Sequence, residues 1–370
     1  MNLLKKLIVF LFNIKLKVVL NKKIKNIYQG ITKKTIKQEI LMKHQQLWSG
    51  LHSNPNLKWM KAYISINEKQ DYRYITEYDY YAKIELCLNN RVLSEAYSDK
   101  NQYHQFIDNH YLPSVYIRNR EGVFYTEDYD LLPPDFLLKD CIKSEAVIVK
   151  HALETGGGKG INKFIKNRNE WIGASGEILS KDFLVKNYKK NFIIQEYITQ
   201  HTFYSQFNTS SLNTVRIFIY RSVKNNEIIS LHSVLRIGAK GAIVDNQASG
   251  GIAVGIDEKG VLSAFGVNKY AQKFKSYNGI MFSEIGKIYK FEEMKSICKQ
   301  IALTFPYHRL LGFDCCVNEK GEIKLIEVNN KNNEINFYQF NNGPLFKEYT
   351  EEIIDYYTKN KRTYVFDFSI

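Results

Sequence analysis

A glycine-rich loop with a lysine is the first stretch that could do chemistry. In Gly156-Gly157-Gly158-Lys159-Gly160 the glycines let the backbone approach phosphate groups and offer N–H donors, and Lys159 adds a positive charge. Lys150 ends an apolar run a few residues earlier. The common P-loop pattern does not fit, because Leu153 stands where its first glycine belongs. The loop indicates phosphate binding, and a flexible hairpin tip at the surface is the alternative.

Acidic and amide side chains gather in a predicted C-terminal hairpin. If its strands pair symmetrically about the four-residue turn, Asp314 lies opposite Leu325. Alternation then puts Leu325, Glu327 and Asn329 on the same face as Asp314. Carboxylate and amide oxygens suit Mg²⁺ that carries nucleotide phosphates. We therefore expect Asp314, Glu327 and Asn329 to bind metal; a solvent-exposed face with ordinary acids is the alternative.

Two arginines lie in predicted strands near a second glycine-containing loop. Arg216 is in the β-branched and aromatic run 214–220, where a guanidinium needs an anionic partner. Arg236 precedes the loop Asp245-Asn246-Gln247-Ala248-Ser249-Gly250-Gly251, whose glycines can approach a ligand closely. Pairing of each arginine with a nearby acid, and a plain hairpin turn, are the alternatives.

These residues require strands joined by short turns. Residues 30–110 have the mixed spacing of helices, 115–125 reads as a strand pair, and the consecutive prolines at 133–134 indicate a linker. Strands outnumber helices after the linker, which predicts an α+β fold with largely antiparallel sheets. We expect strands at 146–150, 192–198, 214–220, 228–237 and 251–256, a helix at 291–304 and a hairpin at 311–328. The expected units are a basic apolar segment 1–30, a mainly helical region 31–134 and a catalytic domain 135–370.

The positive charge is concentrated at the N-terminus. The chain has 370 residues and a net charge of +14, and residues 1–50 hold eleven lysines against the single acid Glu39. That segment therefore carries ten of the net charges, which argues against a nucleic-acid groove across the protein. The apolar run 7–20 is too short and too charged to span a membrane. Either residues 1–25 contact an anionic membrane surface, or they form a packed helix whose lysines face water.

The five cysteines show no CxxC or zinc-site spacing. Their odd number favours reduced thiols and hence a cytoplasmic protein.

The order of these motifs resembles the ATP-grasp superfamily, and more narrowly its sugar-transfer-associated group, related to α-L-glutamate ligases. The resemblance covers about residues 112–346. Its most specific pieces are Ser211-Leu212-Asn213-Thr214-Val215-Arg216, Val244-Asp245-Asn246-Gln247-Ala248-Ser249-Gly250-Gly251-Ile252 and Leu325-Ile326-Glu327-Val328-Asn329. It implies an ATP-grasp fold, two α+β lobes with the nucleotide between them, after the helical N-terminal region.

The resemblance also implies roles for single residues. Lys150, the glycine loop and Lys159 would contact ATP phosphates, and the hinge Gln195-Glu196-Tyr197-Ile198 would meet adenine, with His201 near the ribose. Arg216 and Lys159 would act in catalysis. Asp314, Glu327 and Asn329 would hold Mg²⁺. Arg236, Asp245, Asn246, Gly250 and Gly251 would face the substrate.

The activity implied by the resemblance is ligation of a carboxylate to an amine through an acyl phosphate, with ATP and Mg²⁺. The substrates would be an amino acid or amine and a free or lipid-linked sugar acid, in bacterial surface-polysaccharide (capsule) synthesis. A catalytically weak nucleotide-binding scaffold of a polysaccharide assembly complex is the alternative. A basic nucleic-acid-binding protein is disfavoured by the position of the charge.

Overall fold

The computed structural model describes residues 3–51, 56–153, 160–243, 245, 250–362 and 364. Its N-terminal part is mainly helical, as the sequence predicts. The elements are α1 (Leu3–Gly30), α2 (Gln38–Trp48), α3 (Leu57–Asn67), α4 (Glu77–Asp79), the π-helix η1 (Tyr80–Ile84), α5 (Glu85–Leu88), α6 (Arg91–Ser98) and the 3₁₀-helices η2 (Lys100–Gln105) and η3 (Asn109–Tyr111).

Side-chain caps set where several of these helices begin. The Asn56 side chain accepts a hydrogen bond from the backbone N–H of Lys58 at the start of α3 (3.1 Å). Asp99 accepts one from the N–H of Asn101 at the start of η2 (2.9 Å). The cap at Asp99 therefore fixes the turn that begins with Lys100.

The smaller sheet has six strands in the order β2-β1-β6-β3-β4-β5, and every neighbouring pair is antiparallel. Alternate residues of β3, Val147 and Val149, are buried in one core with Phe164 and with Leu184 of α8 (Lys181–Tyr188). Lys150 lies on the opposite face of β3. The strands are β1 (Val115–Arg120), β2 (Val123–Tyr125), β3 (Ala146–His151), β4 (Asn162–Asn167), β5 (Glu170–Gly173) and β6 (Phe192–Glu196).

The larger sheet has seven strands in the order β11-β10-β9-β8-β7-β14-β15. They are β7 (Thr214–Arg221), β8 (Ile228–Ile237), β9 (Ile252–Ile256), β10 (Leu262–Val267), β11 (Lys273–Phe274), β14 (Leu310–Val317) and β15 (Ile323–Asn329). Alternation gives the sheet two buried faces. Ile217 and Ile219 pack with α10 (Phe291–Ala302), whereas Phe218 and Tyr220 pack with Tyr338 of α11 (Asn336–Asn341).

The register of the β14–β15 hairpin differs from the symmetric pairing that the sequence suggests. Asp314 lies opposite Glu327 and not opposite Leu325. The pairing is already offset by one residue at the turn, where Val317 faces Ile323, and a bulge at Ile326 between Cys315 and Asp314 adds a second residue. The offset at the turn pairs Leu325 with Cys315, and both are buried on the α10 face. Glu327 and Asp314 still share a face, so the predicted juxtaposition of these two carboxylates is confirmed, although the predicted position of Leu325 is wrong.

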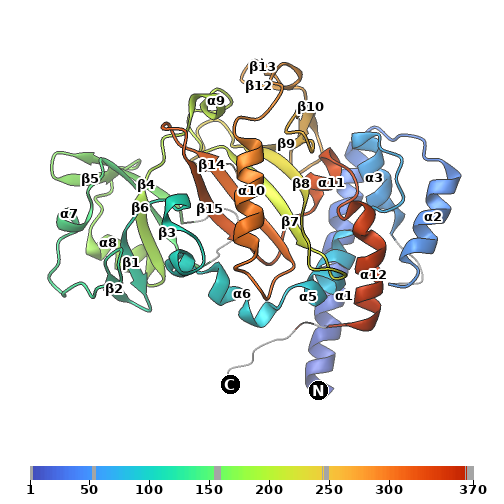
Figure 1. Ribbon diagram of the computed structural model, residues 1–370, viewed down its shortest axis with the longest axis horizontal. Coiled ribbons are helices and arrows are strands. Elements are labelled where there is room, and N and C mark those ends of the chain that lie inside the picture. The colour runs from blue at the N-terminus through green and yellow to red at the C-terminus, as the bar shows by residue number, and fades with distance from the viewer. Residues whose placement is uncertain are drawn as a thin grey trace.

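Figure 1 shows the smaller sheet at one end of the molecule, the larger sheet in the middle, and α1, α2, α3 and α12 (Thr350–Lys359) at the other end. The structure confirms the predicted α+β fold with antiparallel sheets and a helical N-terminal region. The division at residue 134 stays a prediction; β1, before it, pairs with β6, after it. The remaining elements are α7 (Leu138–Cys141), α9 (Thr202–Ser205), β12 (Ser276–Tyr277), β13 (Ile280–Met281), η5 (Phe282–Glu284) and η6 (Lys347–Tyr349).

Candidate active site

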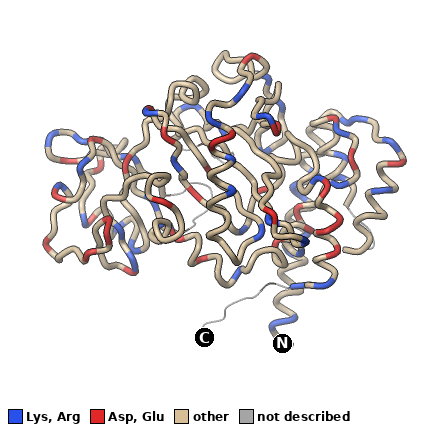
Figure 2. The backbone as a smooth tube through the Cα atoms, in the orientation of Figure 1, with Lys and Arg blue, Asp and Glu red and all other residues tan. Residues whose placement is uncertain are grey.

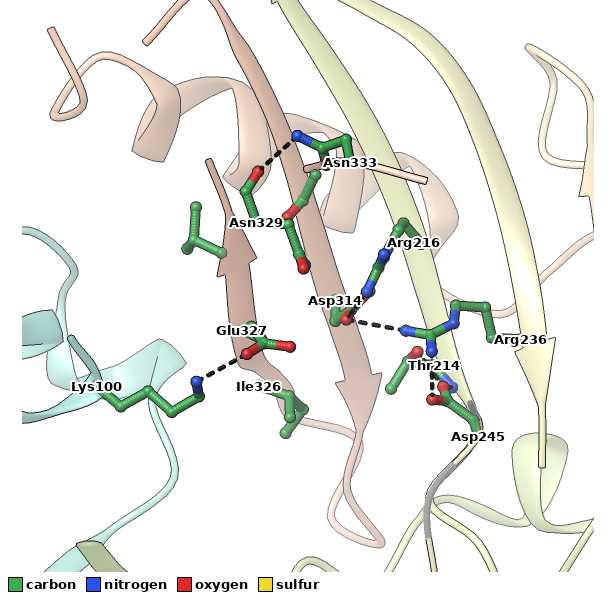
Figure 3. Close-up of polar contacts among 12 residues, drawn as sticks. Lys100, Thr214, Arg216, Arg236, Asp245, Asp314, Ile326, Glu327, Asn329 and Asn333 are labelled. Carbon is green, nitrogen blue, oxygen red and sulfur yellow. Dashed lines mark hydrogen bonds and ion pairs between the residues drawn. The ribbon is translucent and has the colours of Figure 1, made fainter. Parts of the chain in front are cut away.

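A row of charged side chains crosses three strands of the larger sheet. Asp314 is the register partner of Arg216 on one side and of Glu327 on the other. Arg236 pairs with Thr214, two residues before Arg216, so its side chain lies on the same face. Figure 3 shows these side chains gathered over β7, β8, β14 and β15. The strand registers thus bring together four residues that the sequence assigns to catalysis, substrate and metal.

Asp314 lies between the two arginines. The Nε and Nη2 groups of Arg216 donate to its two carboxylate oxygens, and Nη1 of Arg236 donates to Oδ2 (3.0 Å). Burial alone would raise the pKa of Asp314, but the two guanidinium groups hold it below its ordinary value. Asp314 is therefore an ionised group bound by cationic side chains. These contacts confirm the alternative considered from the sequence, that each arginine pairs with a nearby acid.

Asp245 extends the cluster toward the predicted substrate loop. Its carboxylate accepts from the backbone N–H (3.1 Å) and hydroxyl of Thr214 and pairs with Nη2 of Arg236 (3.1 Å). Burial raises the pKa of Asp245 although Arg236 opposes the effect. Arg236 thus bridges two buried carboxylates. Of the other residues predicted to face the substrate with Asp245, Gly250 and Gly251 follow a few positions later in the chain, and Asn246 lies outside the described residues.

Two lysines reach Glu327 and the bulge beside it. Nζ of Lys100 lies 2.7 Å from Oε1 of Glu327, whose side chain is 29 % exposed. Nζ of Lys150 lies 3.5 Å from the carbonyl oxygen of Ile326. Burial lowers the pKa of Lys150 to about 7, and the nearby charge of Lys100 adds to the effect. Lys100 carries no sequence motif and was not predicted; only the folding of η2 against β15 reveals it.

The oxygen donors near Glu327 fit a hard cation in their chemistry. Asn329 donates its amide to the carbonyl of Gly312 (3.2 Å), and Asn333 donates to the backbone carbonyl of Asn329 (3.1 Å). Among the residues that the structure describes, none donates a hydrogen bond to the buried Oδ1 of Asn333, so an oxygen that could bind a metal is left unused beside the predicted ligands. Within the described ranges no group of three or more His, Cys, Asp or Glu side chains could hold a metal. A metal here would rely on amide oxygens and on the substrate.

The predicted hinge is a strand end with well-defined partners. The Glu196 carboxylate accepts from the backbone N–H of Ser114 (2.9 Å), and the Tyr197 N–H donates to the carbonyl of Ala146 (3.1 Å). Nζ of Lys163 lies 3.5 Å from the centre of the Tyr197 ring. Lys100, Lys150 and Gln195 line one cavity of about 80 Å³ between the sheets. Gln195 and Ile198 are buried at the same strand end.

His201 lies apart from this cavity lining. Its ring accepts from the N–H of Phe203 (3.2 Å) as the cap of α9, and it stacks on Tyr289 with the ring centres 4.4 Å apart. The predicted ribose contact stays a prediction. Gly156, Gly157, Gly158 and Lys159 lie outside the described residues, so the glycine-loop prediction also stands untested.

The comparisons with known proteins give one family and several distant structures. Residues 79–354 match the model of the sugar-transfer associated ATP-grasp family. A search of the curated proteins found no match.

The solved structures that resemble the chain share little sequence with it. N5-carboxyaminoimidazole ribonucleotide synthetase in its ADP complex is 11 % identical with a TM-score of 0.40, covering 75 % of this chain and 56 % of that one. The ATP-grasp ligase PsnB with a precursor variant, Mg and ADP is 12 % identical (TM-score 0.40; 73 % and 62 %). The biotin carboxylase domain of Hydrogenobacter thermophilus 2-oxoglutarate carboxylase is 13 % identical (TM-score 0.43; 74 % and 47 %). The chain thus spans about half to three-fifths of the length of these proteins.

The family match includes both sheets and the whole charged cluster, and it leaves out α1 to α3. On that match over most of its length, the chain belongs to the sugar-transfer associated ATP-grasp family.

Proposed function

We propose that the chain is an ATP- and Mg²⁺-dependent ligase that joins a carboxylate to an amine through an acyl phosphate. The observation that carries the proposal is the row Arg216, Asp314 and Glu327 across β7, β14 and β15, with Lys100 and Lys150 beside it. Membership of the ATP-grasp family supports ATP-dependent ligation as the general class of activity.

The cations of the cluster are suited to an anionic substrate. Lys100, Arg216, Arg236 and Lys150 face the three carboxylates of Asp245, Asp314 and Glu327. An incoming phosphate would raise the pKa of Lys150 and so draw a proton onto it. The side chains would then offset the negative charge of a transferring phosphoryl group, which is the main task of a protein in this chemistry. Because Asp314 already holds Arg216 in place, this arginine would not need to reorient when the phosphoryl group is transferred.

Glu327 and Asn329, with Asp314 beside them, would hold Mg²⁺ next to the nucleotide phosphates. When bound, the metal would supply further neutralisation of phosphate charge. The two ion pairs of Asp314 suggest that it mainly positions Arg216 and Arg236, while Glu327 is the more accessible oxygen donor.

The proposed substrates are an amino acid or amine and a sugar acid of a bacterial surface polysaccharide, handled in the cytoplasm. The family description, sugar-transfer associated, supports a sugar-containing substrate. Arg236 and Asp245 would face it from the loop that ends at Gly250-Gly251.

A nucleotide-binding scaffold without turnover is the second candidate. One observation favours it: both carboxylates predicted to bind metal are paired with cationic side chains, Asp314 with two arginines and Glu327 with Lys100. A ligase and a scaffold differ in whether an acceptor stimulates the release of phosphate from ATP.

The deciding experiment measures phosphate release from MgATP while amino acids and uronic acids are added singly and in pairs. A ligase releases phosphate only when a suitable pair is present, and product mass shows loss of water between the two. Nucleotide binding with no phosphate release for any pair would instead support the scaffold.

A further inference from the structure

Helix α1 carries one apolar face that is buried. Its buried side chains Leu20, Ile24 and Ile27 pack with Trp59 and Tyr63 of α3. Nζ of Lys23 also pairs with the buried carboxylate of Glu77 (2.8 Å). The second half of α1 is therefore docked on the protein.

A second apolar face of α1 is exposed. Its side chains recur at intervals of one, three or four residues, which places them within about a third of the helix circumference. We call them the α1 stripe: Leu3, Leu4, Leu7, Phe10, Leu11, Ile14 and Val18, each between 45 % and 82 % exposed. The stripe lies roughly opposite the buried face. Two opposing apolar faces explain why the sequence shows no single hydrophobic side.

The charge on α1 is of one sign. The helix contains no Asp or Glu, and its lysines 5, 6, 15, 17, 22 and 25 are exposed. Lys15 and Lys17 flank the stripe, and Lys22 and Lys25 continue its face toward the C-terminal end of the helix. Figures 1 and 2 show the N-terminal end of α1 projecting beyond the body of the molecule, with basic and no acidic positions along it.

We propose that α1 lies in the plane of an anionic lipid surface, with the stripe among the acyl chains and the flanking lysines at the headgroups. An exposed apolar face flanked by lysines has the pattern of an interfacial helix. None of the helices within the described ranges is long and apolar enough to cross a membrane. A second copy of α1 is a poorer occupant, because two helices without acids would bring their lysines together.

Flotation of the full chain with lipid vesicles tests the proposal. We expect binding to vesicles with 30 % phosphatidylglycerol at low salt, at least tenfold less binding to phosphatidylcholine alone, and release at high salt. The variant Leu7→Ser/Leu11→Ser/Val18→Ser should bind at least tenfold less.

The matched control is Val92→Ser/Leu131→Ser/Leu303→Ser, which removes three apolar side chains elsewhere that are at least as exposed. It should bind like the wild type, and both variants should keep the wild-type unfolding temperature. Failure of the wild type to float with anionic vesicles, or equal loss in both variants, would overturn the proposal. So would a lipid-free dimer that only the stripe variant abolishes, because a second copy would then be the occupant. None of these outcomes depends on whether the chain turns over ATP.

Discussion

At the scale of single residues, Asp314 and Glu327 differ although they face each other. Asp314 is buried and bound by two arginines, whereas Glu327 is partly exposed and bound by one lysine. Removing Asp314 leaves the buried guanidinium of Arg216 without its partner and Arg236 with Asp245 alone, and breaking a buried pair in this way costs about 3–5 kcal/mol. A loss of activity in such a variant would reflect unfolding as much as chemistry. Glu327 is the better residue for testing the metal prediction.

Glu327→Gln should abolish most Mg²⁺-dependent ATP turnover while the protein stays folded. The amide keeps the shape of the side chain but binds a hard cation more weakly. We expect ATP turnover to fall more than about 100-fold, which exceeds the loss usual for a residue that only orients a metal ligand. Turnover is measured against Mg²⁺ concentration. The control Glu95→Gln removes an exposed acid paired with Lys331 and should leave turnover unchanged. Wild-type turnover in Glu327→Gln would place the metal elsewhere.

Lys150 predicts a specific pH dependence of stability. Its pKa is lowered to about 7, first by burial and then by Lys100, while an unfolded lysine titrates near 10.4. Between these values the unfolded chain binds one more proton than the folded chain, so this residue's contribution to stability rises with pH. Below pH 7 it is constant.

The comparison variant is Lys150→Met. The free energy of unfolding of wild type minus that of the variant should rise from pH 7 to pH 9.5, by at most about 1.4 kcal/mol per pH unit. Urea unfolding at several pH values measures it. Lys186→Met, at an exposed position of α8, should give a flat difference. A flat difference for Lys150→Met as well would show that its amine is solvated.

At the scale of elements, strands were easier to predict than their register. Runs such as Thr214–Tyr220 are rich in β-branched and aromatic residues, and the turns between them are short. The bulge at Ile326 has no comparable signal, since no glycine marks it and isoleucine is an ordinary strand residue. The pairing of Glu327 with Lys100 was unpredictable because it depends on long-range docking of η2 on the hairpin.

The docking of α1 can be tested through its ion pair with α4. Lys23→Ala leaves the buried Glu77 carboxylate with the Asn336 amide (2.6 Å) and without its cation. Burial already raises the pKa of Glu77, with Lys23 opposing it, so the variant raises that pKa further. We expect a loss of about 1–3 kcal/mol at pH 7.5.

The stability lost in Lys23→Ala should shrink as the pH falls. The carboxyl of Glu77 has a raised pKa in the folded protein, so its protonation at low pH stabilises the folded state, and stability decreases as the pH rises through that pKa. Thermal unfolding at pH 5.5 and 7.5 measures the effect. Lys25→Ala removes an exposed lysine from the same helix and serves as the control. Equal unfolding temperatures for the two variants at both pH values would contradict a docked α1.

At the scale of the whole molecule, the candidate site joins parts that are distant in the sequence. The larger sheet supplies the arginines and carboxylates, β3 of the smaller sheet supplies Lys150, and the helical region supplies Lys100. The sequence identified the first two because strands with buried charge are conspicuous. It could not identify the third, since a lysine in a helical turn is commonplace.

A nucleotide bound between the sheets should stabilise the whole chain. At 100 times its dissociation constant, MgATP adds about 2.7 kcal/mol, or on the order of 5 °C in unfolding temperature. Differential scanning fluorimetry with ATP, with and without Mg²⁺, measures the shift. The Glu327→Gln variant should lose the Mg²⁺-dependent part only. No shift at millimolar MgATP in the wild type would exclude this chain as a nucleotide-binding protein under those conditions.

The contacts of α3 with α11 limit how this protein can be recombined with its relatives. Tyr63 donates to the side chain of Asn336 (2.6 Å), and Asn67 donates to the carbonyl of Gln339 (2.7 Å), although α3 precedes the segment that matches the family. A chimera cut at residue 79 would strip these two buried hydrogen bonds from α11, together with those that join Gln339 to the backbone of Ile75 and Asn336 to Glu77. Shuffling experiments should therefore exchange α3 and α11 together.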